Sequence, residues 1–172
     1  MDAKEDHTEN LQGGEAIQKL KDIVDRSAMC MFTTHLSSIP LTSRPMSTLQ
    51  VDDEGNLWFL SAKDSKKNVE ITEDEQVHLF YLNSGNSEYL SLSGVATILY
   101  NRSKIEELWN AFIKAWFTEG KDDPRISVIK VQPKQVYYWD TKHGKMVSLL
   151  KIMTGMVIGK TMDDSLEGAL NV

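Results

Sequence analysis

A short basic segment contains the residues best suited to bind an anion. Lys63, Lys66 and Lys67 follow a strand-like apolar run, and Ser61 and Ser65 lie among them. A helix that begins near Ser65 has unpaired N–H groups and a partial positive charge in its first turn. Lysines are unfavourable there by about 0.3–1 kcal/mol each, unless an anion such as phosphate binds at the helix N-terminus. The segment predicts either a phosphate-type site or, alternatively, a solvated basic turn capped by Ser65.

A proline interrupts a second strand-like stretch, at Arg44-Pro45-Met46. Proline has no N–H to donate to a sheet, so Pro45 indicates an edge strand or a bulge. Backbone groups beside it are left free to bind a planar polar group. The alternative is an edge strand protected against aggregation.

Aromatic side chains provide further candidates for ligand contact. Trp109 and Trp116 recur at helical spacing, which favours core or interface positions. Trp139 lies on a late strand, where it could pack or form the wall of an aromatic-ligand site.

Other motifs for catalysis or metal binding are missing from the sequence. Cys30 is the only cysteine and lies in an apolar run, so we interpret it as a core thiol. The four histidines are scattered, and no glycine-rich phosphate loop, GxSxG turn or HExxH motif occurs. We predict no catalytic side chain and no metal site.

The pattern of apolar residues predicts the elements that position these groups. Helices are expected after residue 13, over about 65–72 with Val69 and Ile71 facing inward, and from Ser103 to about Trp116. Gly94, inside a predicted strand, indicates a bulge or a close backbone approach. Strands are expected over residues 29–34, 41–51, 57–62, 76–83, 89–100, 126–131 and 135–140, the last two separated by Pro133.

These elements predict a single α+β domain built on an antiparallel sheet of six or seven strands, curved into a barrel, with flanking helices. We place a flexible tail at residues 1–13 and the domain at 14–172, with a C-terminal extension from about residue 141. The extension could hold a short helix and an edge strand.

Composition excludes several classes of partner. The 172 residues carry 25 acidic and 19 basic side chains, for a net charge of −6, whereas duplex-binding domains usually have a basic excess. The acid-rich first residues do not form a secretory signal. The longest apolar run, residues 146–159, contains Lys151 and is too short to span a bilayer. We expect a cytoplasmic protein that binds neither nucleic acid nor membrane.

Taken in order, these segments resemble the pyridoxamine 5′-phosphate oxidase-like FMN-binding split-barrel family, and most of all its bacterial general-stress-protein branch. The resemblance covers about residues 17–140. It rests on five ordered segments: Ser43-Arg44-Pro45-Met46; Leu57-Trp58-Phe59-Leu60-Ser61 with Ser65-Lys66-Lys67; Ser91-Leu92-Ser93-Gly94-Val95-Ala96; residues 116–124; and Tyr138-Trp139-Asp140.

The resemblance implies a split β-barrel that binds FMN, with FAD as the alternative, at a homodimer interface. It implies that Arg44 bonds the pyrimidine edge of the flavin, where it would stabilise negative charge on the reduced ring, and that Pro45 and Met46 present backbone atoms. It places the phosphate at Leu60, Ser61, Lys66 and Lys67. Trp139 would contact the flavin from the partner subunit, and Trp116 would do the same.

One departure from the family affects the expected activity. Pyridoxamine phosphate oxidases follow this tryptophan with an arginine-histidine motif, whereas Asp140-Thr141-Lys142-His143-Gly144 follows Trp139 here. We therefore expect a redox protein of the stress-response type that works by hydride or electron transfer with an unknown donor and acceptor, and not an oxidase of pyridoxamine phosphate. The alternatives are a flavin carrier or sensor without turnover, a barrel that binds deazaflavin or haem, and a dimer without a cofactor.

Overall fold

The computed structural model describes residues 8–27, 29–141 and 165–172, which form a mixed α+β fold with three α-helices and one nine-stranded sheet. The helices are α1 (Gly13–Ser27), α2 (Lys66–Glu73) and α3 (Arg102–Leu108), and 3-10 turns follow at Ile113–Ala115 and Gly120–Asp122. The strands are β1 (Leu11–Gln12), β2 (Met29–Thr34), β3 (Thr42–Ser47), β4 (Gln50–Val51), β5 (Leu57–Ala62), β6 (Gln76–Asn83), β7 (Glu88–Leu99), β8 (Ile126–Thr141) and β9 (Ser165–Asn171).

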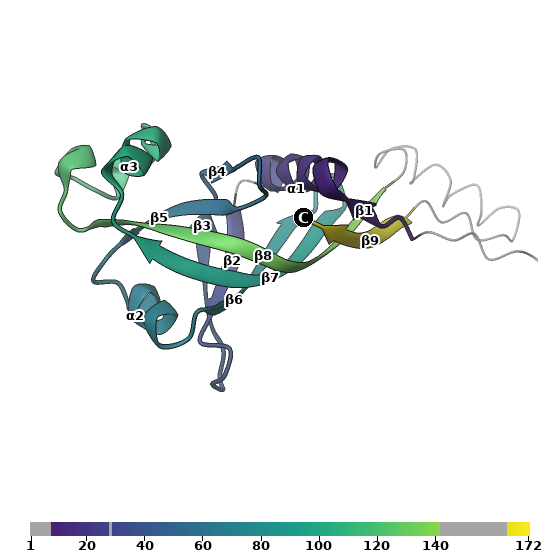
Figure 1. Ribbon diagram of the computed structural model, residues 1–172, viewed down its shortest axis with the longest axis horizontal. Coiled ribbons are helices and arrows are strands. Elements are labelled where there is room, and N and C mark those ends of the chain that lie inside the picture. The colour runs from purple at the N-terminus through teal and green to yellow at the C-terminus, as the bar shows by residue number, and fades with distance from the viewer. Residues whose placement is uncertain (1–7, 28, 142–164) are drawn as a thin grey trace, which may run out of the picture.

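The sheet is not closed, and its opening lies between β3 and β5. The strands follow the order β1-β9-β8-β7-β6-β2-β3, and β5 branches from β8 with β4 on its other side (Figure 1). The first part of β8 pairs with β5 and its last part pairs with β9, so this long strand has two successive pairing partners along one edge. Only Thr48 and Leu49 separate β3 from β4, so the chain itself crosses the opening at one end.

Nine strands replace the six or seven expected. The predicted strand over 41–51 is divided into β3 and β4. Residues up to Ser47 pair with β2, and residues from Gln50 pair with β5. Conversely, the two strands predicted on either side of Pro133 form the single strand β8. Pro133 lies opposite Gly94, at a register shift in which Lys134 has no partner on β7, so the proline is tolerated at a bulge.

The structure confirms both backbone irregularities predicted from the sequence. Pro45 lies on β3, which pairs only with β2 among the described strands and is therefore an edge strand. Gly94 lies at the bulge, where a Cβ atom would be 2.6 Å from the carbonyl oxygen of Gln132.

We expect Gly94→Ala to lower the free energy of unfolding by about 1–3 kcal/mol, because the strand pair must separate to admit the methyl group. Urea denaturation measures the change. Gly14→Ala is the matched control, since nothing lies within 4 Å of its added Cβ. A Gly94→Ala variant as stable as the control would show that the two strands do not approach this closely.

The helix predicted from Ser103 to Trp116 is wrong in both its start and its length. It begins one residue after Asn101, whose side chain accepts a hydrogen bond from the Lys104 N–H. It ends at Leu108, because Trp109 has an extended backbone with ψ 129°. The Asn110 side chain then accepts from the Ile113 N–H at 3.0 Å and starts a separate turn. Asn101 thus starts the helix, and Asn110 lies at the break that divides the apolar pattern.

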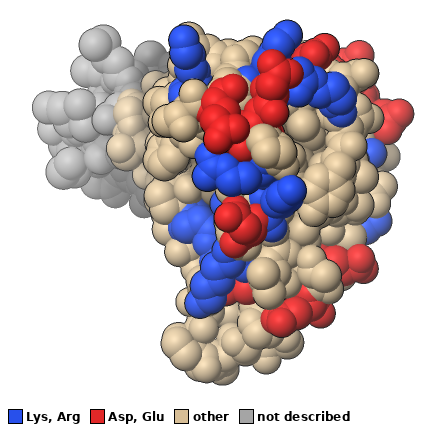
Figure 2. All heavy atoms as spheres, turned by 90° about the vertical axis from the view of Figure 1, so that its left-hand side faces the viewer, with Lys and Arg blue, Asp and Glu red and all other residues tan. Residues whose placement is uncertain are grey.

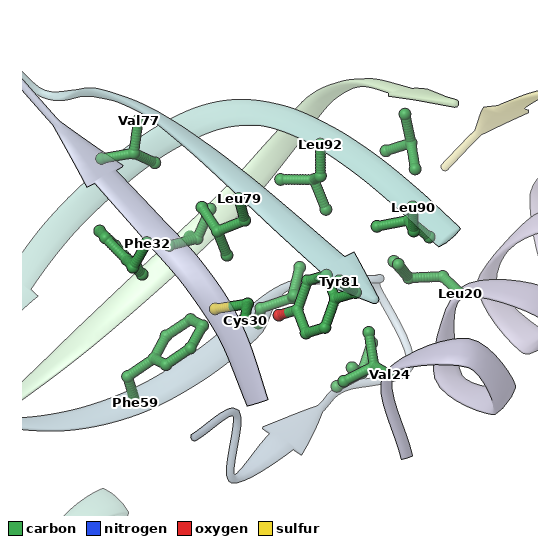
Figure 3. Packing of buried hydrophobic residues seen from close by; sticks show 14 of the residues in the cluster. Leu20, Val24, Cys30, Phe32, Phe59, Val77, Leu79, Tyr81, Leu90 and Leu92 are labelled. Atoms are coloured by element: carbon green, nitrogen blue, oxygen red, sulfur yellow. The ribbon is translucent and has the colours of Figure 1, made fainter. Parts of the chain in front are cut away.

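The core lies between α1 and the concave side of the sheet. The apolar face of α1 is buried, with Leu20 and Ile23 fully inaccessible. Figure 3 shows Leu20 and Val24 facing the side chains of β2, β6 and β7. Cys30 is buried beside Tyr81, and burial raises the pKa of its thiol to about 12, which confirms its interpretation as a core residue.

The two ends of the described chain lie side by side, because β1 pairs with β9. Thr8 bridges to Glu167, and β1 pairs in parallel with β9, so residues 8–12 of the expected tail lie along the sheet. β9 is the strand expected in the C-terminal extension. It lies between β8 and β1 rather than at an edge. The short helix suggested for the extension falls outside the described residues.

Candidate ligand site at the sheet opening

A cavity of about 290 Å³ occupies the place where β3 and β5 do not pair. Its walls come from β3, the end of β5, the start of α2 and the segment 112–117, with Arg125 at its rim. Most of the predicted site residues line it: Pro45, Met46, Leu60, Ser61, Lys67 and Trp116. The opening in the sheet therefore brings together residues that are far apart in the sequence.

The cavity has an apolar part and a cationic end. Met29, Leu49, Phe112, Ile113 and Phe117 contribute apolar surface, and none of the five was predicted as a site residue. The cationic end carries Lys67 and Arg125, beside the Ser61 hydroxyl. Such a cavity suits a ligand with a planar apolar body and a negatively charged end.

The start of α2 is fixed to the end of β5 by a buried polar network. Ser61 Oγ donates to Asn68 Oδ1 at 2.7 Å, and Asn68 Nδ2 donates to Ser127 Oγ at 2.9 Å. Ser65 occupies the N-cap position, but its hydroxyl donates to Asn68 and caps no backbone N–H. The Asn68 N–H donates to the Ser65 carbonyl oxygen at 3.0 Å, whereas the N–H groups of Lys66 and Lys67 form no such bond within the described residues and remain donors for the predicted anion site.

The two lysines at this helix start differ in environment. Lys66 has a side chain that is 79% exposed, lies outside the cavity lining and is 3.5 Å from Glu70. Lys67 lines the cavity, and burial together with the nearby Arg44 charge lowers its pKa. No carboxylate of the described residues forms an ion pair with Lys67. A half-buried cation without a counter-ion favours an anion at this position.

Arg44 is held by a carboxylate that the sequence analysis missed. Its Nη2 donates to Glu70 Oε2 at 2.7 Å and its Nη1 donates to Thr34 Oγ1 at 2.5 Å, so the guanidinium lies beside the cavity but is absent from its lining. Glu70 is 4% exposed. Although Glu70 is buried, the hydrogen bonds from Thr34 and Arg44 lower its pKa and keep it ionised.

The inward face of α2 differs from the prediction. Asn68, Glu70 and Ile71 are buried, whereas Val69, expected to face inward, is 53% exposed. Two polar side chains occupy the buried face because each finds specific partners on the sheet. The prediction is therefore confirmed for Ile71 and wrong for Val69.

Trp139 lies apart from this cavity, over a second hollow of about 450 Å³ on the opposite face of the sheet from the core. Its neighbours there are Met31, Phe80, Leu82 and Tyr89, all partly exposed. They are adjacent across the strands, since Met31 lies opposite Phe80, Leu82 opposite Tyr89, and Tyr89 opposite Trp139. One chain thus does not bring Trp139 to the other predicted site residues.

Arg125 was also missed as a cavity residue. Its Nη2 pairs with Asp123 at 2.7 Å, and its carbonyl accepts from the Lys63 N–H, which joins this turn to the end of β5. The available signal was its place directly after Pro124, at the end of one of the five ordered segments. Figure 2 shows the side of the molecule that carries α2, α3 and the 112–125 segment, where basic side chains form a band with acidic ones interspersed.

The open antiparallel sheet with a cavity at its opening defines a class of fold, and comparison with known proteins identifies the family. A family model described as "Pyridoxamine 5′-phosphate oxidase like" matches residues 15–163, so the chain belongs to this family. Among curated relatives, Protein bli-3 of Neurospora crassa is 27% identical over 156 residues, covering 85% of this chain and 75% of that protein. General stress protein 26 of Bacillus subtilis is 24% identical over 135 residues, covering 77% and 94%.

Solved structures share the same fold. A putative general stress protein 26 from Jannaschia sp. CCS1 superposes with a TM-score of 0.78 at 21% identity, covering 92% of this chain and 99% of that chain. The general stress FMN/FAD binding protein of Xanthomonas citri gives a TM-score of 0.63 at 21% identity, covering 73% and 87%. Within the ranges that the structure describes, no helix has the length and apolar character needed to cross a membrane.

Proposed function

We propose that this protein binds FMN in the cavity between β3 and β5, with the phosphate at the start of α2. The observation that carries the proposal is the half-buried Lys67, which lines the cavity at a helix N-terminus and has no counter-ion among the described residues. Membership of the pyridoxamine 5′-phosphate oxidase-like family supports it. The Xanthomonas citri protein, which shares the fold, is described as binding FMN or FAD.

The donor set of the cavity fits a flavin mononucleotide. The edge of β3 that faces away from β2 has no strand beside it among the described residues, so alternate backbone groups near Pro45 and Met46 are available to a polar ring edge. Leu60 and the segment 112–117 offer apolar contact. Trp116 in that segment lines the cavity and is 71% exposed. A single cationic end favours a monophosphate over the longer diphosphate of FAD.

We assign roles to individual residues on this basis. Lys67 and the Ser61 region contact the phosphate, and the exposed Lys66 can turn toward it. Arg44 uses two N–H groups for Thr34 and Glu70, and a guanidinium has five. The remaining donors can reach the pyrimidine edge of the ring, where a positive charge raises the reduction potential.

We further propose a homodimer in which the partly exposed apolar residues of the outer sheet face form the contact. Met31, Phe80, Leu82 and Tyr89 share this face with Trp139. Cross-strand neighbours of this kind form a continuous apolar surface, which is typical of an interface between copies. In the dimer Trp139 would close the flavin site of the partner subunit. The open sheet would then be the split barrel characteristic of this family.

The bound flavin would supply hydride or electron transfer, while the chain supplies binding, orientation and charge. We propose redox chemistry other than the oxidation of pyridoxamine phosphate, because Asp140 and Thr141 follow Trp139 in place of an arginine-histidine pair and no arginine occurs after Arg125.

Titration of the protein with FMN, riboflavin and FAD tests the proposal. We expect FMN to bind at least about tenfold more tightly than riboflavin, because a charge-assisted phosphate contact contributes about 1.5–3 kcal/mol. FAD should bind more weakly than FMN. Equal affinity for FMN and riboflavin would contradict a phosphate site at α2.

A further inference from the structure

Glu70 is the one buried carboxylate in the described part of the chain that touches both ends of the proposed site. Its Oε2 accepts from Thr34 Oγ1 at 2.6 Å and from Arg44 Nη2 at 2.7 Å, and its Oε1 is 3.5 Å from Lys66 Nζ. The same carboxylate thus joins β2, β3 and the first turn of α2.

The hydrogen bonds around Glu70 leave Arg44 little freedom. Arg44 Nη1 donates to Thr34 Oγ1, and Thr34 Oγ1 donates in turn to the same Glu70 oxygen that accepts from Arg44 Nη2. These three hydrogen bonds form a closed ring, which fixes the plane of the guanidinium. An arginine held in this way loses less conformational freedom when it binds a ligand.

Glu70 also sets the charge of the site. Arg44, Lys66 and Lys67 contribute three positive charges and Glu70 one negative charge, which leaves a net charge of two positive. Arg125 does not add to this total, because it is paired with Asp123. A phosphate monoester carries about −1.5 to −2 at pH 7. The cluster is therefore matched in charge to such a group.

We propose that Glu70 is a positioning residue for the ligand site: its carboxylate fixes the guanidinium of Arg44 beside the cavity and reduces the positive charge that the phosphate meets. The inference rests on the proposed function. It deepens that function by assigning a role to a residue that does not itself contact the ligand but holds a residue that does. A carboxylate that only tied α2 to the sheet would affect stability and leave the discrimination between phosphorylated and unphosphorylated ligands unchanged.

Two substitutions separate the two roles. In Glu70→Gln the amide oxygen can take the place of Oε2 and still accept from Arg44 and Thr34, while the NH₂ group faces Lys66, so the charge is lost and the anchor is kept. Glu70→Ala loses both the negative charge and the hydrogen-bond acceptor that anchors Arg44. Glu73→Gln, at the exposed C-terminal end of the same helix, is the matched control.

Binding constants for FMN and riboflavin, measured by titration of each variant, give the result. We expect the ratio of FMN to riboflavin affinity to rise by about threefold to tenfold in Glu70→Gln and in Glu70→Ala, because a negative charge beside the phosphate is removed. Riboflavin affinity should be unchanged in Glu70→Gln and fall by about tenfold in Glu70→Ala, as is usual when a supporting residue is lost. Glu73→Gln should match the wild type.

An unchanged or lower ratio in Glu70→Gln would overturn the charge role, and riboflavin binding in Glu70→Ala equal to that of the wild type would overturn the positioning role. If Glu70→Ala does not fold, Thr34→Val replaces it. It removes the Thr34 link without changing charge, and should lower riboflavin affinity with no change in the ratio.

Inorganic phosphate provides a readout that does not depend on the flavin. We expect phosphate to raise the melting temperature of Glu70→Gln more than that of the wild type, and an equal or smaller increase would contradict the charge role. A wild-type protein that binds neither FMN nor riboflavin refutes the proposed function, while the phosphate measurement still decides the role of Glu70.

Discussion

Replacement of Lys67 by methionine is expected to weaken FMN binding by about thirtyfold, since a charge-assisted hydrogen bond to phosphate contributes about 2 kcal/mol. Lys67 has the largest expected effect because it lines the cavity and is half-buried without a counter-ion among the described residues. Methionine keeps most of the apolar stem, so the loss reports on the ammonium group. Fluorescence titration with FMN and with riboflavin measures it.

Riboflavin should bind the Lys67→Met variant as it binds the wild type, because it has no phosphate. Lys63→Met is the matched control: Lys63 belongs to the same basic segment but is exposed and lies outside the cavity lining. An equal loss for Lys63→Met and Lys67→Met would mean that the segment attracts anions only through its general charge. The alternative of a solvated basic turn would then be correct.

The second large effect is expected at the outer sheet face. Leu82→Glu should raise the dissociation constant of the dimer by at least about a hundredfold, because a two-fold interface would bury two unpaired carboxylates. Leu82 is 59% exposed in one chain, so the substitution should leave the fold of the monomer intact. Sedimentation velocity over a range of concentrations measures the change.

Leu41→Glu is the matched control for this variant, because Leu41 is 58% exposed but lies outside the hollow around Trp139. It should remain dimeric. Leu82→Glu should also bind FMN more weakly, since the partner's Trp139 would no longer close the site. A Leu82→Glu protein that stays dimeric would place the interface on another surface.

Local sequence features predicted the individual elements of the fold well. The strands Met29–Thr34, Leu57–Ala62 and Gln76–Asn83 have the bounds expected from their apolar and β-branched residues. The bulge at Gly94 and the edge position of Pro45 were also readable, because each residue has one strong backbone property. Each of these predictions depends on a residue and its near neighbours in the chain.

Features that depend on partners far away in sequence were harder to predict. Pro133 was predicted to separate two strands, yet its position opposite Gly94 lets β8 continue. Asn101 and Asn110 gave no apolar signal, although their side chains decide where α3 begins and where the next turn starts. These outcomes depend on strand register and on single hydrogen bonds, neither of which periodicity contains.

In the candidate site, too, local features were predicted and features that depend on distant partners were missed. The basic start of α2 and the Ser61 region were recognised from residue types, and the fold places Ser61 and Lys67 in one cavity. Glu70 was missed because a buried carboxylate is explained only by its partners on other elements, Thr34 and Arg44. A charged residue between two apolar ones, Val69 and Ile71, was the available signal, and the sequence analysis assigned Glu70 no role.

The most direct test of the central claim is the visible absorption spectrum of the purified protein, together with the mass of any compound that heat releases from it. We predict the two absorption bands of a bound flavin and the mass of FMN. A colourless protein that also fails to bind added FMN would contradict the account. The lysines at the start of α2 would then be surface charges, and the chain would have the fold of its family without this ligand.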